Sequence, residues 1–270
     1  MLSSLHLTVN PNKIQKKLKL MTIAGILLLS LHARLSMAQF ARIIDHNTIC
    51  WLTTINTIST GKKTSLHLEY SERRTEFIST PMQELIRAGM YYRINPKVTL
   101  LAGGAYFFNY PYSQFPSISP YVRFPERRMF EQIAINDSLR SLSILHRVRL
   151  EQRWSGRMDS ADVKKVDYWS YTNRIRYLVR LARPIIRPLK GKGGLYAVAQ
   201  NEIFISFGKN VKSNIFNQNR LTFLLGTRLT KSLSLECGYL NQIIQPGNII
   251  DNKSVFQYNK GFQAILLFNK

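Results

Sequence analysis

The sequence predicts an all-β fold, a transmembrane antiparallel β-barrel of about twelve strands, with ten as the next alternative, after an N-terminal signal peptide. Three observations support this fold class: a secretory signal opens the chain, apolar and polar residues alternate along most of the remainder, and the alternating runs are about 10 to 15 residues long. Soluble strands typically have about 5–6 residues, whereas a tilted membrane-spanning strand needs about 9–11. The runs are therefore long enough to cross a bilayer.

The N-terminal segment has the three parts of a secretory signal peptide in the right order. Lysines between Lys13 and Lys19 precede the apolar run Leu20–Leu31, and Ser36-Met37-Ala38 provides a small-residue cleavage site. The apolar run is shorter than the about 20 residues of a transmembrane helix, although an N-terminal anchor helix is the alternative. We expect residues 1–38 to be the signal peptide and residues 39–270 to form a barrel in the outer membrane of a Gram-negative bacterium.

The strands follow one another as eleven alternating runs, each with an apolar face and a polar face. In chain order the runs read CWLTTI, SLHLEY, LIRAGMYYR, TLLAGGAYFF, RMFEQIAI, HRVRLEQRW, NRIRYLVRL, QNEIFISF, RLTFLLGTR, LSLECGYL and GFQAILLF. Their predicted centres are Trp51, Leu68, Met90, Gly104, Phe130, Leu150, Ile175, Glu202, Leu225, Leu235 and Gln263.

The connections alternate between short and long. The short turns are 60–63, 95–97 and 230–232, and the long polar loops are 111–125, 155–166, 208–215 and 243–252. Short periplasmic turns and longer external loops are typical of bacterial barrels. The segment 184–194 is the exception, because it is long where the alternation requires a short turn.

Antiparallel closure of the ring requires an even number of strands. A short strand near Phe40–Ile44 is the expected twelfth, since bacterial barrels prefer even counts; alternatively this first segment threads the lumen. The chain ends GFQAILLFNK, and Phe268 near the terminus resembles the assembly signal of outer-membrane proteins. The barrel-assembly machinery is therefore an expected partner.

The polar faces of the strands carry the richest chemistry in the chain. An arginine facing lipid costs about 2–4 kcal/mol near the bilayer midplane, so we expect these side chains to point inward. The predicted lumen charge network consists of Glu69, Arg73, Arg147, Arg149, Glu151, Arg153, Arg174, Arg176, Arg180, Glu202, Arg220, Arg228 and Glu236.

The network has two interpretations, which the sequence leaves open. In the first, ion pairs plug and stiffen a narrow barrel. In the second, the arginines line a narrow anion-preferring pore, since arginine rings favour anions. A barrel of eight strands is filled by side chains and one of about 16–18 leaves a wide channel, so a twelve-stranded barrel lies between these limits.

The net positive charge of the chain raises the question of which molecules its basic residues contact. The mature chain of 270 − 38 = 232 residues has 33 basic and 15 acidic side chains, a formal charge of about +18. Basic proteins often bind nucleic acid, but these charges sit within strands, so no nucleic-acid partner is expected. We expect contact with outer-membrane lipid and lipopolysaccharide, and ordinary solvated loops are the alternative. The loop residues for this contact are Arg157, Lys164, Lys209 and Lys212.

No catalytic, cofactor-binding or metal site is predicted, and the protein is not expected to be an enzyme. Lipid-modifying barrels carry a histidine and a serine two residues apart on the outer face; His46 and His146 lack such a serine, and His67 is expected to face the lumen. Such an enzyme, or a barrel that binds lipopolysaccharide or glycans, remains the alternative. Cys50 and Cys237 could pair only if the two ends of the barrel meet, and no oligomeric state follows from the sequence.

The ordered segments resemble a Bacteroidota-type outer-membrane family known as domain of unknown function number twenty-four ninety. The resemblance is carried by the turn TGKK before SLHLEYSERR, then LLAGGAYFFNY, HRVRLEQRW, NRIRYLVRL, QNEIFISF, NQNRLTFLLG and LECGYLNQ. It covers nearly all of the mature chain and implies an outer-membrane barrel without an established activity. The resemblance therefore adds fold and compartment to the interpretation, and little mechanism.

Overall fold

The computed structural model of the protein describes residues 42–115, 123–158, 165–186, 193–211 and 213–270, which form twelve strands. The predicted signal peptide, residues 1–38, lies outside the described residues. None of the described residues belongs to a helix that is long and apolar enough to cross a membrane. The strands are β1 (Arg42–Ser59), β2 (Thr64–Thr75), β3 (Thr80–Arg93), β4 (Val98–Asn109), β5 (Phe124–Leu139), β6 (Leu142–Arg157), β7 (Tyr168–Ile186), β8 (Leu195–Phe207), β9 (Phe216–Arg228), β10 (Leu233–Ile244), β11 (Ile249–Ile250) and β12 (Lys253–Asn269).

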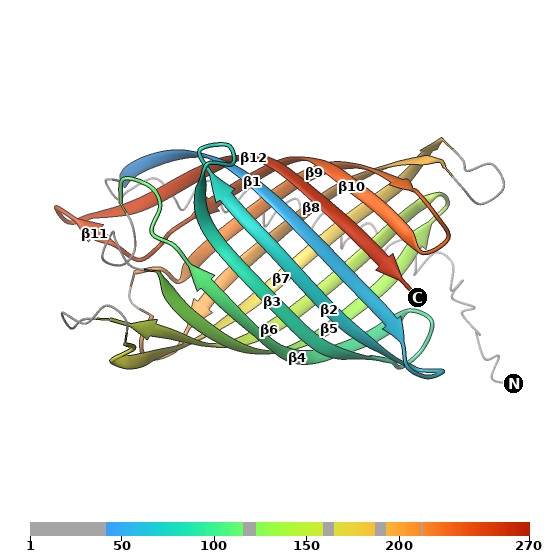
Figure 1. Ribbon diagram of the computed structural model, residues 1–270, viewed down its shortest axis with the longest axis horizontal. Coiled ribbons are helices and arrows are strands. Elements are labelled where there is room, and N and C mark those ends of the chain that lie inside the picture. The colour runs from blue at the N-terminus through green and yellow to red at the C-terminus, as the bar shows by residue number, and fades with distance from the viewer. Residues whose placement is uncertain (1–41, 116–122, 159–164, 187–192, 212) are drawn as a thin grey trace, which may run out of the picture. The chain divides into compact units, whose positions relative to one another are not determined.

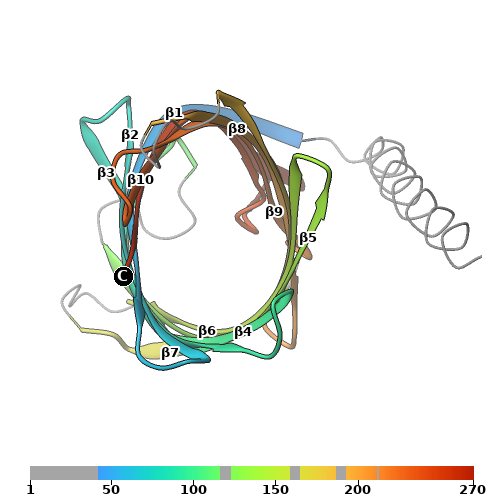
Figure 2. The ribbon, with the colours of Figure 1, turned by 90° about the vertical axis from the view of Figure 1, so that its right-hand side faces the viewer.

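Eleven of these strands close into a barrel (Figures 1 and 2). The order around the ring is β1 to β10 and then β12, and β11 is a two-residue strand that pairs with the start of β12. Each of the eleven predicted strand centres falls in a different barrel strand. The predicted all-β barrel is therefore confirmed.

The barrel closes through a parallel pair, which differs from the antiparallel closure expected from the sequence. Strand β1 lies alongside β12 from the pair Arg42–Ser254 to the pair Thr57–Asn269. Because the ring has an odd number of strands, its first and last strands run in the same direction. Arg42–Ile44 belong to β1, so they form no separate twelfth barrel strand; Phe40 and Ala41 lie outside the described residues.

The parallel pair is unusually close at one point. Gly261 of β12 lies opposite Ile49 of β1, and a Cβ atom at Gly261 would overlap the backbone of Ile49. Only glycine therefore fits this position without moving the strands apart.

Most short turns lie at one end of the barrel and most long loops at the other, as the sequence predicts. The connections 60–63, 94–97, 140–141 and 229–232 are short and share one end. Lys270 lies at this turn end, where its carbonyl oxygen accepts a 2.7 Å hydrogen bond from the amide of Ser59. The connections between β4 and β5, β6 and β7, β8 and β9, and β10 and β12 have eight or more residues and lie at the other, loop end. Two connections depart from this order. The β2–β3 connection, 76–79, is short and lies at the loop end, whereas the β7–β8 connection, 187–194, has eight residues and lies at the turn end, where the sequence predicts the exception.

The two faces of the wall differ in polarity, because successive side chains of a strand point to opposite faces. Along β9, Leu221, Phe223 and Leu225 are exposed, whereas Thr222 and Leu224 between them are buried. The outward face of the barrel is mainly apolar, and the inward face holds most of the buried arginine and glutamate side chains. A buried apolar group of Val198, Leu224 and Ile265 lies on the inward face near the turn end.

Candidate functional site

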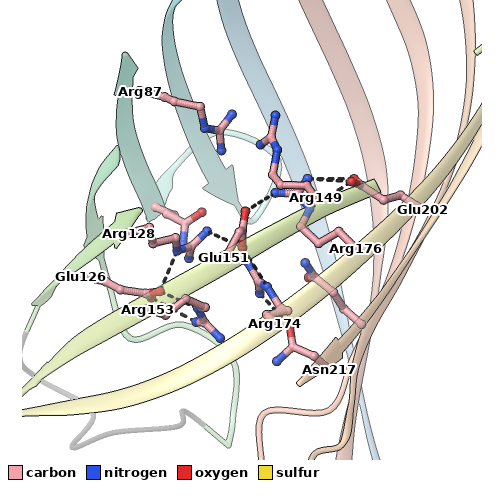
Figure 3. Close-up of polar contacts among 12 residues, drawn as sticks. Arg87, Glu126, Arg128, Arg149, Glu151, Arg153, Arg174, Arg176, Glu202 and Asn217 are labelled. Carbon is pink, nitrogen blue, oxygen red and sulfur yellow. Dashed lines mark hydrogen bonds and ion pairs between the residues drawn. The ribbon is translucent and has the colours of Figure 1, made fainter. Parts of the chain in front are cut away.

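The lumen holds a network of charged side chains contributed by most of the barrel strands (Figure 3). Among the described residues we include ten arginines and five glutamates, a formal charge of +5, and call this set the lumen network. It consists of Arg73, Arg87, Arg128, Arg147, Arg149, Arg153, Arg174, Arg176, Arg180, Arg220, Glu69, Glu126, Glu151, Glu202 and Glu236.

Glu151 on β6 is the centre of the lumen network. Its side chain accepts hydrogen bonds from Arg174 at 2.6 and 3.0 Å and from Arg176 at 2.6 Å, and a nitrogen of Arg128 lies 3.9 Å away. The residue is only 1% exposed. Strand register explains the arrangement, because Glu151 lies directly opposite Arg174 in the β6–β7 pair. One carboxylate thus compensates three guanidinium groups.

Glu202 is a second carboxylate that binds two arginines. Glu202 on β8 accepts hydrogen bonds from Arg176 at 2.9 and 3.0 Å and from Arg147 at 2.7 Å. Arg176 therefore bridges Glu151 and Glu202 and joins β6, β7 and β8.

Glu126, near the loop end of β5, also binds two arginines. It accepts hydrogen bonds from Arg128 at 2.6 Å and from Arg153 at 2.6 and 3.1 Å. Glu126 and Arg128 lie on the same face of β5, and Arg153 comes from the neighbouring strand β6.

Glu236 and Glu69 form smaller groups on other parts of the wall. Glu236 on β10 accepts hydrogen bonds from Arg180 at 2.5 Å and from the Tyr196 hydroxyl at 2.9 Å. Because Arg180 belongs to β7, this ion pair reaches across the lumen to a strand that is not its neighbour. Glu69 pairs with Arg87, and His67 Nε2 lies 3.5 Å from its carboxylate.

Three arginines of the network have no carboxylate within ion-pair distance among the described residues. Arg149, 3% exposed, donates two hydrogen bonds to Gln132 at 2.6 and 2.9 Å. Arg73 donates one to Gln83 at 2.5 Å. The side chain of Arg220 makes no hydrogen bond to a described residue. Each of these three arginines has one buried nitrogen without a hydrogen-bond partner in the part of the chain that the structure describes.

Aromatic rings contact arginines of the network, both those without a carboxylate partner and the paired Arg128. Guanidinium carbons lie 4.8 Å from the Phe130 ring for Arg149, 4.6 Å from the Phe204 ring for Arg220, and 3.5 Å from the Phe107 ring for Arg128. Such cation–π contacts contribute about 0.5–2 kcal/mol each. They stabilise the positive charges in part and leave the charge excess unchanged.

The structure places twelve of the thirteen predicted residues in the lumen network. Arg228 is the exception: it lies at the turn end of β9 and is exposed, so it is separate from the buried network.

Sequence reasoning missed Arg87, Glu126 and Arg128. Alternation along β3 contained the signal for Arg87. On β5, however, charged residues follow one another directly, and Arg127 points outward, 4.4 Å from the Trp169 ring. The period-two pattern alone could not say which of Arg127 and Arg128 faces inward.

Amide side chains line the part of the lumen formed by β9, β10, β12 and β1. Gln242 donates a 2.8 Å hydrogen bond to Gln218 and accepts one of 3.2 Å from Asn259, which in turn accepts a bond of 3.0 Å from Asn47. Tyr112, from the loop after β4, reaches into this group and donates to Gln257 at 3.0 Å. Asp45 of β1 is buried beside this group and accepts a 3.1 Å hydrogen bond from Asn47. The lumen wall is thus rich in charged residues on one side and mainly neutral polar on the other.

Two cavities follow one another along the lumen. The vestibule cavity, of about 670 Å³, opens toward the loop end and is lined by residues such as Arg157, Asn217 and Lys209. The mid-lumen cavity, of about 340 Å³, is lined by eight arginines and three glutamates together with apolar residues such as Ile55, Leu178 and Leu267. Arg73, Arg128 and Arg220 line both cavities, so these three side chains mark the neck between them.

The histidines and cysteines form no second site in the described part of the chain. Ser65 lies two positions before His67 on the same face of β2, but neither ring nitrogen of His67 has a hydrogen-bond partner. His146 instead contacts the Tyr177 hydroxyl at 2.9 Å. Among the described residues no group of three or more metal-ligating side chains converges.

Cys50 and Cys237 are free thiols on the strands that flank β12. Neighbouring strands lie about 4.8 Å apart, so two strand spacings exceed the about 7 Å that a disulfide can bridge between Cα atoms. The open question of a Cys50–Cys237 bridge is therefore answered: this barrel geometry does not allow one.

Comparison with known proteins gives one match. The family model described as Protein of unknown function (DUF2490) matches residues 48–253, from β1 to the first residue of β12. No curated protein and no solved structure matches the chain significantly. The resemblance inferred from the ordered strand segments is therefore confirmed, and the chain belongs to the DUF2490 family of proteins of unknown function.

Proposed function

We propose that the protein is an integral outer-membrane β-barrel whose arginine-rich lumen acts as a narrow, anion-preferring pore. The observation that carries the proposal is the excess of five positive charges in the lumen network. A network that served only to stiffen the wall is expected to be balanced, because each buried charge without a partner costs several kcal/mol. Arginine-lined pores favour anions, and an anion in the lumen would offset the excess.

The outward face supports the membrane part of the proposal. Large apolar side chains exposed on the barrel wall include Leu52, Ile86, Met129, Ile175, Phe223, Leu225 and Phe262. Exposed apolar patches of such extent are unfavourable in water, whereas an outward apolar band is a general property of outer-membrane barrels. The signal peptide expected at residues 1–38 agrees with this compartment, and the long loops then face the outside.

The lumen contains three zones that an anion would meet in turn. It would enter the polar vestibule cavity, pass the neck at Arg73, Arg128 and Arg220, and reach the mid-lumen cavity. Toward the turn end it would then meet the buried apolar group of Val198, Leu224 and Ile265. Apolar constrictions restrict ion flow by excluding water. We therefore expect small currents rather than the conductance of an open porin.

Planar-bilayer recording tests the proposal. In a potassium chloride gradient, the reversal potential should have the sign of chloride preference. The Arg149→Gln variant should reduce this preference because it removes a lumen charge, whereas Arg74→Gln, which removes an equal charge from the outer side of β2, should not. A folded barrel without conductance, or with cation preference, would overturn the pore.

A structural role is the second candidate, and Glu151 favours it. One carboxylate that binds Arg174 and Arg176 and lies near Arg128 holds three strands together. In this case the ion pairs would stiffen a closed barrel and no current would appear. Catalysis is not part of either proposal. Contact with lipopolysaccharide phosphates is an additional possibility for Arg157 and Lys209 at the vestibule cavity; Lys164 and Lys212 lie outside the described residues.

A further inference from the structure

Two arginines of the lumen network approach the same aromatic ring. The guanidinium carbon of Arg73 lies 4.1 Å from the centre of the Trp51 ring, and that of Arg220 lies 4.7 Å from it. Arg73 projects from β2 and Arg220 from β9, with β10, β12 and β1 between them in the ring. The two guanidinium groups therefore converge from separate parts of the wall, no farther apart than the sum of those two distances.

No described residue forms an ion pair with either of these two like charges. Neither arginine has a carboxylate within ion-pair distance, and the Nε atom of each is buried without a hydrogen-bond partner. A cation–π contact contributes about 0.5–2 kcal/mol, less than the several kcal/mol that an unpaired buried ion costs. The geometry is therefore incomplete without a negatively charged group.

We propose that Arg73 and Arg220 together bind a tetrahedral oxyanion of the phosphate or sulfate class at the neck between the two cavities. Each guanidinium is a planar fork that binds two oxygens of one oxyanion. Two such forks on one phosphate, with hydrogen bonds of about 2.8 Å, place each guanidinium carbon roughly 4 Å from the phosphorus. Because the Trp51 ring lies close to both guanidinium groups, the oxyanion would meet the two forks at an angle, on the side of the pair away from the ring.

The position of the site deepens the proposed function, on which it rests, by naming the anion class. Both arginines line the vestibule cavity and the mid-lumen cavity. An oxyanion at this point would occupy the passage itself rather than a side pocket. The mid-lumen cavity is larger than one phosphate and partly apolar, so the oxyanion can be free or can be the head of an ester with a short apolar group.

Calorimetric titration of the folded barrel in detergent tests the site, with inorganic phosphate as the probe at constant ionic strength in chloride. Phosphate should bind saturably, and at least tenfold more weakly to Arg73→Gln and to Arg220→Gln. The matched controls, Arg74→Gln on the outer side of β2 and Arg228→Gln at the exposed end of β9, should bind as the wild type does. Absence of saturable phosphate binding, or equal binding by all four variants, would overturn the site.

Two further measurements keep the site and the pore separable. The Arg220→Lys variant keeps the charge and lacks the fork, so it should retain chloride preference in bilayers while its phosphate affinity falls at least tenfold. Phosphate binding without conductance would support the site and refute the pore, and anion conductance without phosphate binding would do the reverse. Titration with butyl phosphate distinguishes the source: tighter binding than inorganic phosphate indicates an ester, and weaker binding indicates the free oxyanion.

Discussion

Ile86 and Arg87 are neighbours on β3, yet the isoleucine is 63% exposed while the arginine is 6% exposed and paired with Glu69. In a soluble barrel the opposite distribution is expected, with isoleucine inside and arginine in water. The same inversion recurs around the ring, for example at Ile175 and Arg176 of β7. It provides a direct way to test which solvent surrounds the barrel.

A charge on the outer face should destabilise the folded barrel in lipid. We expect Ile86→Lys to lower the free energy of unfolding by about 2–4 kcal/mol, as for a basic side chain near the bilayer midplane. Urea titration of the protein in phospholipid vesicles measures this. The control is Lys97→Arg, which alters an exposed basic residue in a short turn. An unchanged or increased stability of Ile86→Lys would argue for an aqueous environment.

Removing the central carboxylate of the lumen should also be costly. We expect Glu151→Gln to destabilise the barrel by about 3–5 kcal/mol, because Arg174 and Arg176 would remain buried without full compensation. The midpoint of the unfolding-dependent shift in gel mobility gives the measurement. Asp251→Asn is the control, because it removes an equal charge from an exposed residue in the connection before β12, and it should have little effect. Equal stability of the two variants would mean that the ion pairs of Glu151 do not stabilise the folded barrel.

The native cysteines report on the outer face without any substitution. Cys50 and Cys237 alternate with the inward residues Trp51 and Glu236, so both thiols point outward. In vesicles they should react slowly with a charged, water-soluble thiol reagent and quickly with a membrane-permeant apolar maleimide. A Lys209→Cys variant supplies an aqueous control at the loop end. Rapid labelling of the native thiols by the charged reagent in vesicles would contradict the lipid-facing assignment.

The mature protein should be recovered from the outer-membrane fraction and should migrate faster on gels when it is not heated. Mass spectrometry should find Gln39 as its first residue if the signal peptide is removed after Ala38. The soluble periplasmic fraction serves as the comparison. Recovery of most of the protein in that fraction would reject the proposed location.

Period-two alternation was sufficient to locate all eleven barrel strands, since successive side chains of a strand point to opposite faces of the wall and these faces differ in polarity. The same rule brought most of the lumen network onto one face. It could not decide between Arg127 and Arg128, where two charged residues are adjacent, and it gave no weight to amides such as Gln242 and Asn259. These side chains suit either face of a strand, so only their hydrogen bonds assign them to the lumen.

Barrel closure was beyond the reach of local patterns. Whether β1 and β12 run antiparallel or parallel depends on the total number of strands, and no residue within either strand carries that information. Gly261 is a residue that the close β1–β12 contact requires, but a glycine in a strand can equally mark a bulge or a tight bend. The position of Arg220 beside Trp51 was equally hidden. Arg73 lies opposite Trp51 in the β1–β2 pair, but Arg220 belongs to β9, which only closure of the ring brings near β1.

Because the closing pair is parallel, the first and last strands place the two ends of the wall-forming chain at opposite rims, whereas an even-stranded barrel has both at the same rim. Arg42 lies beside Ser254 at the loop end, and Lys270 lies beside Ser59 at the turn end, so the polypeptide enters the wall at one rim and leaves it at the other. In the proposed orientation, a peptide fused directly before Arg42 would be displayed outside the cell, and one fused after Lys270 would remain in the periplasm. During assembly, hairpins can be added one after another up to β12, but the last seam must form between two strands that no turn can connect.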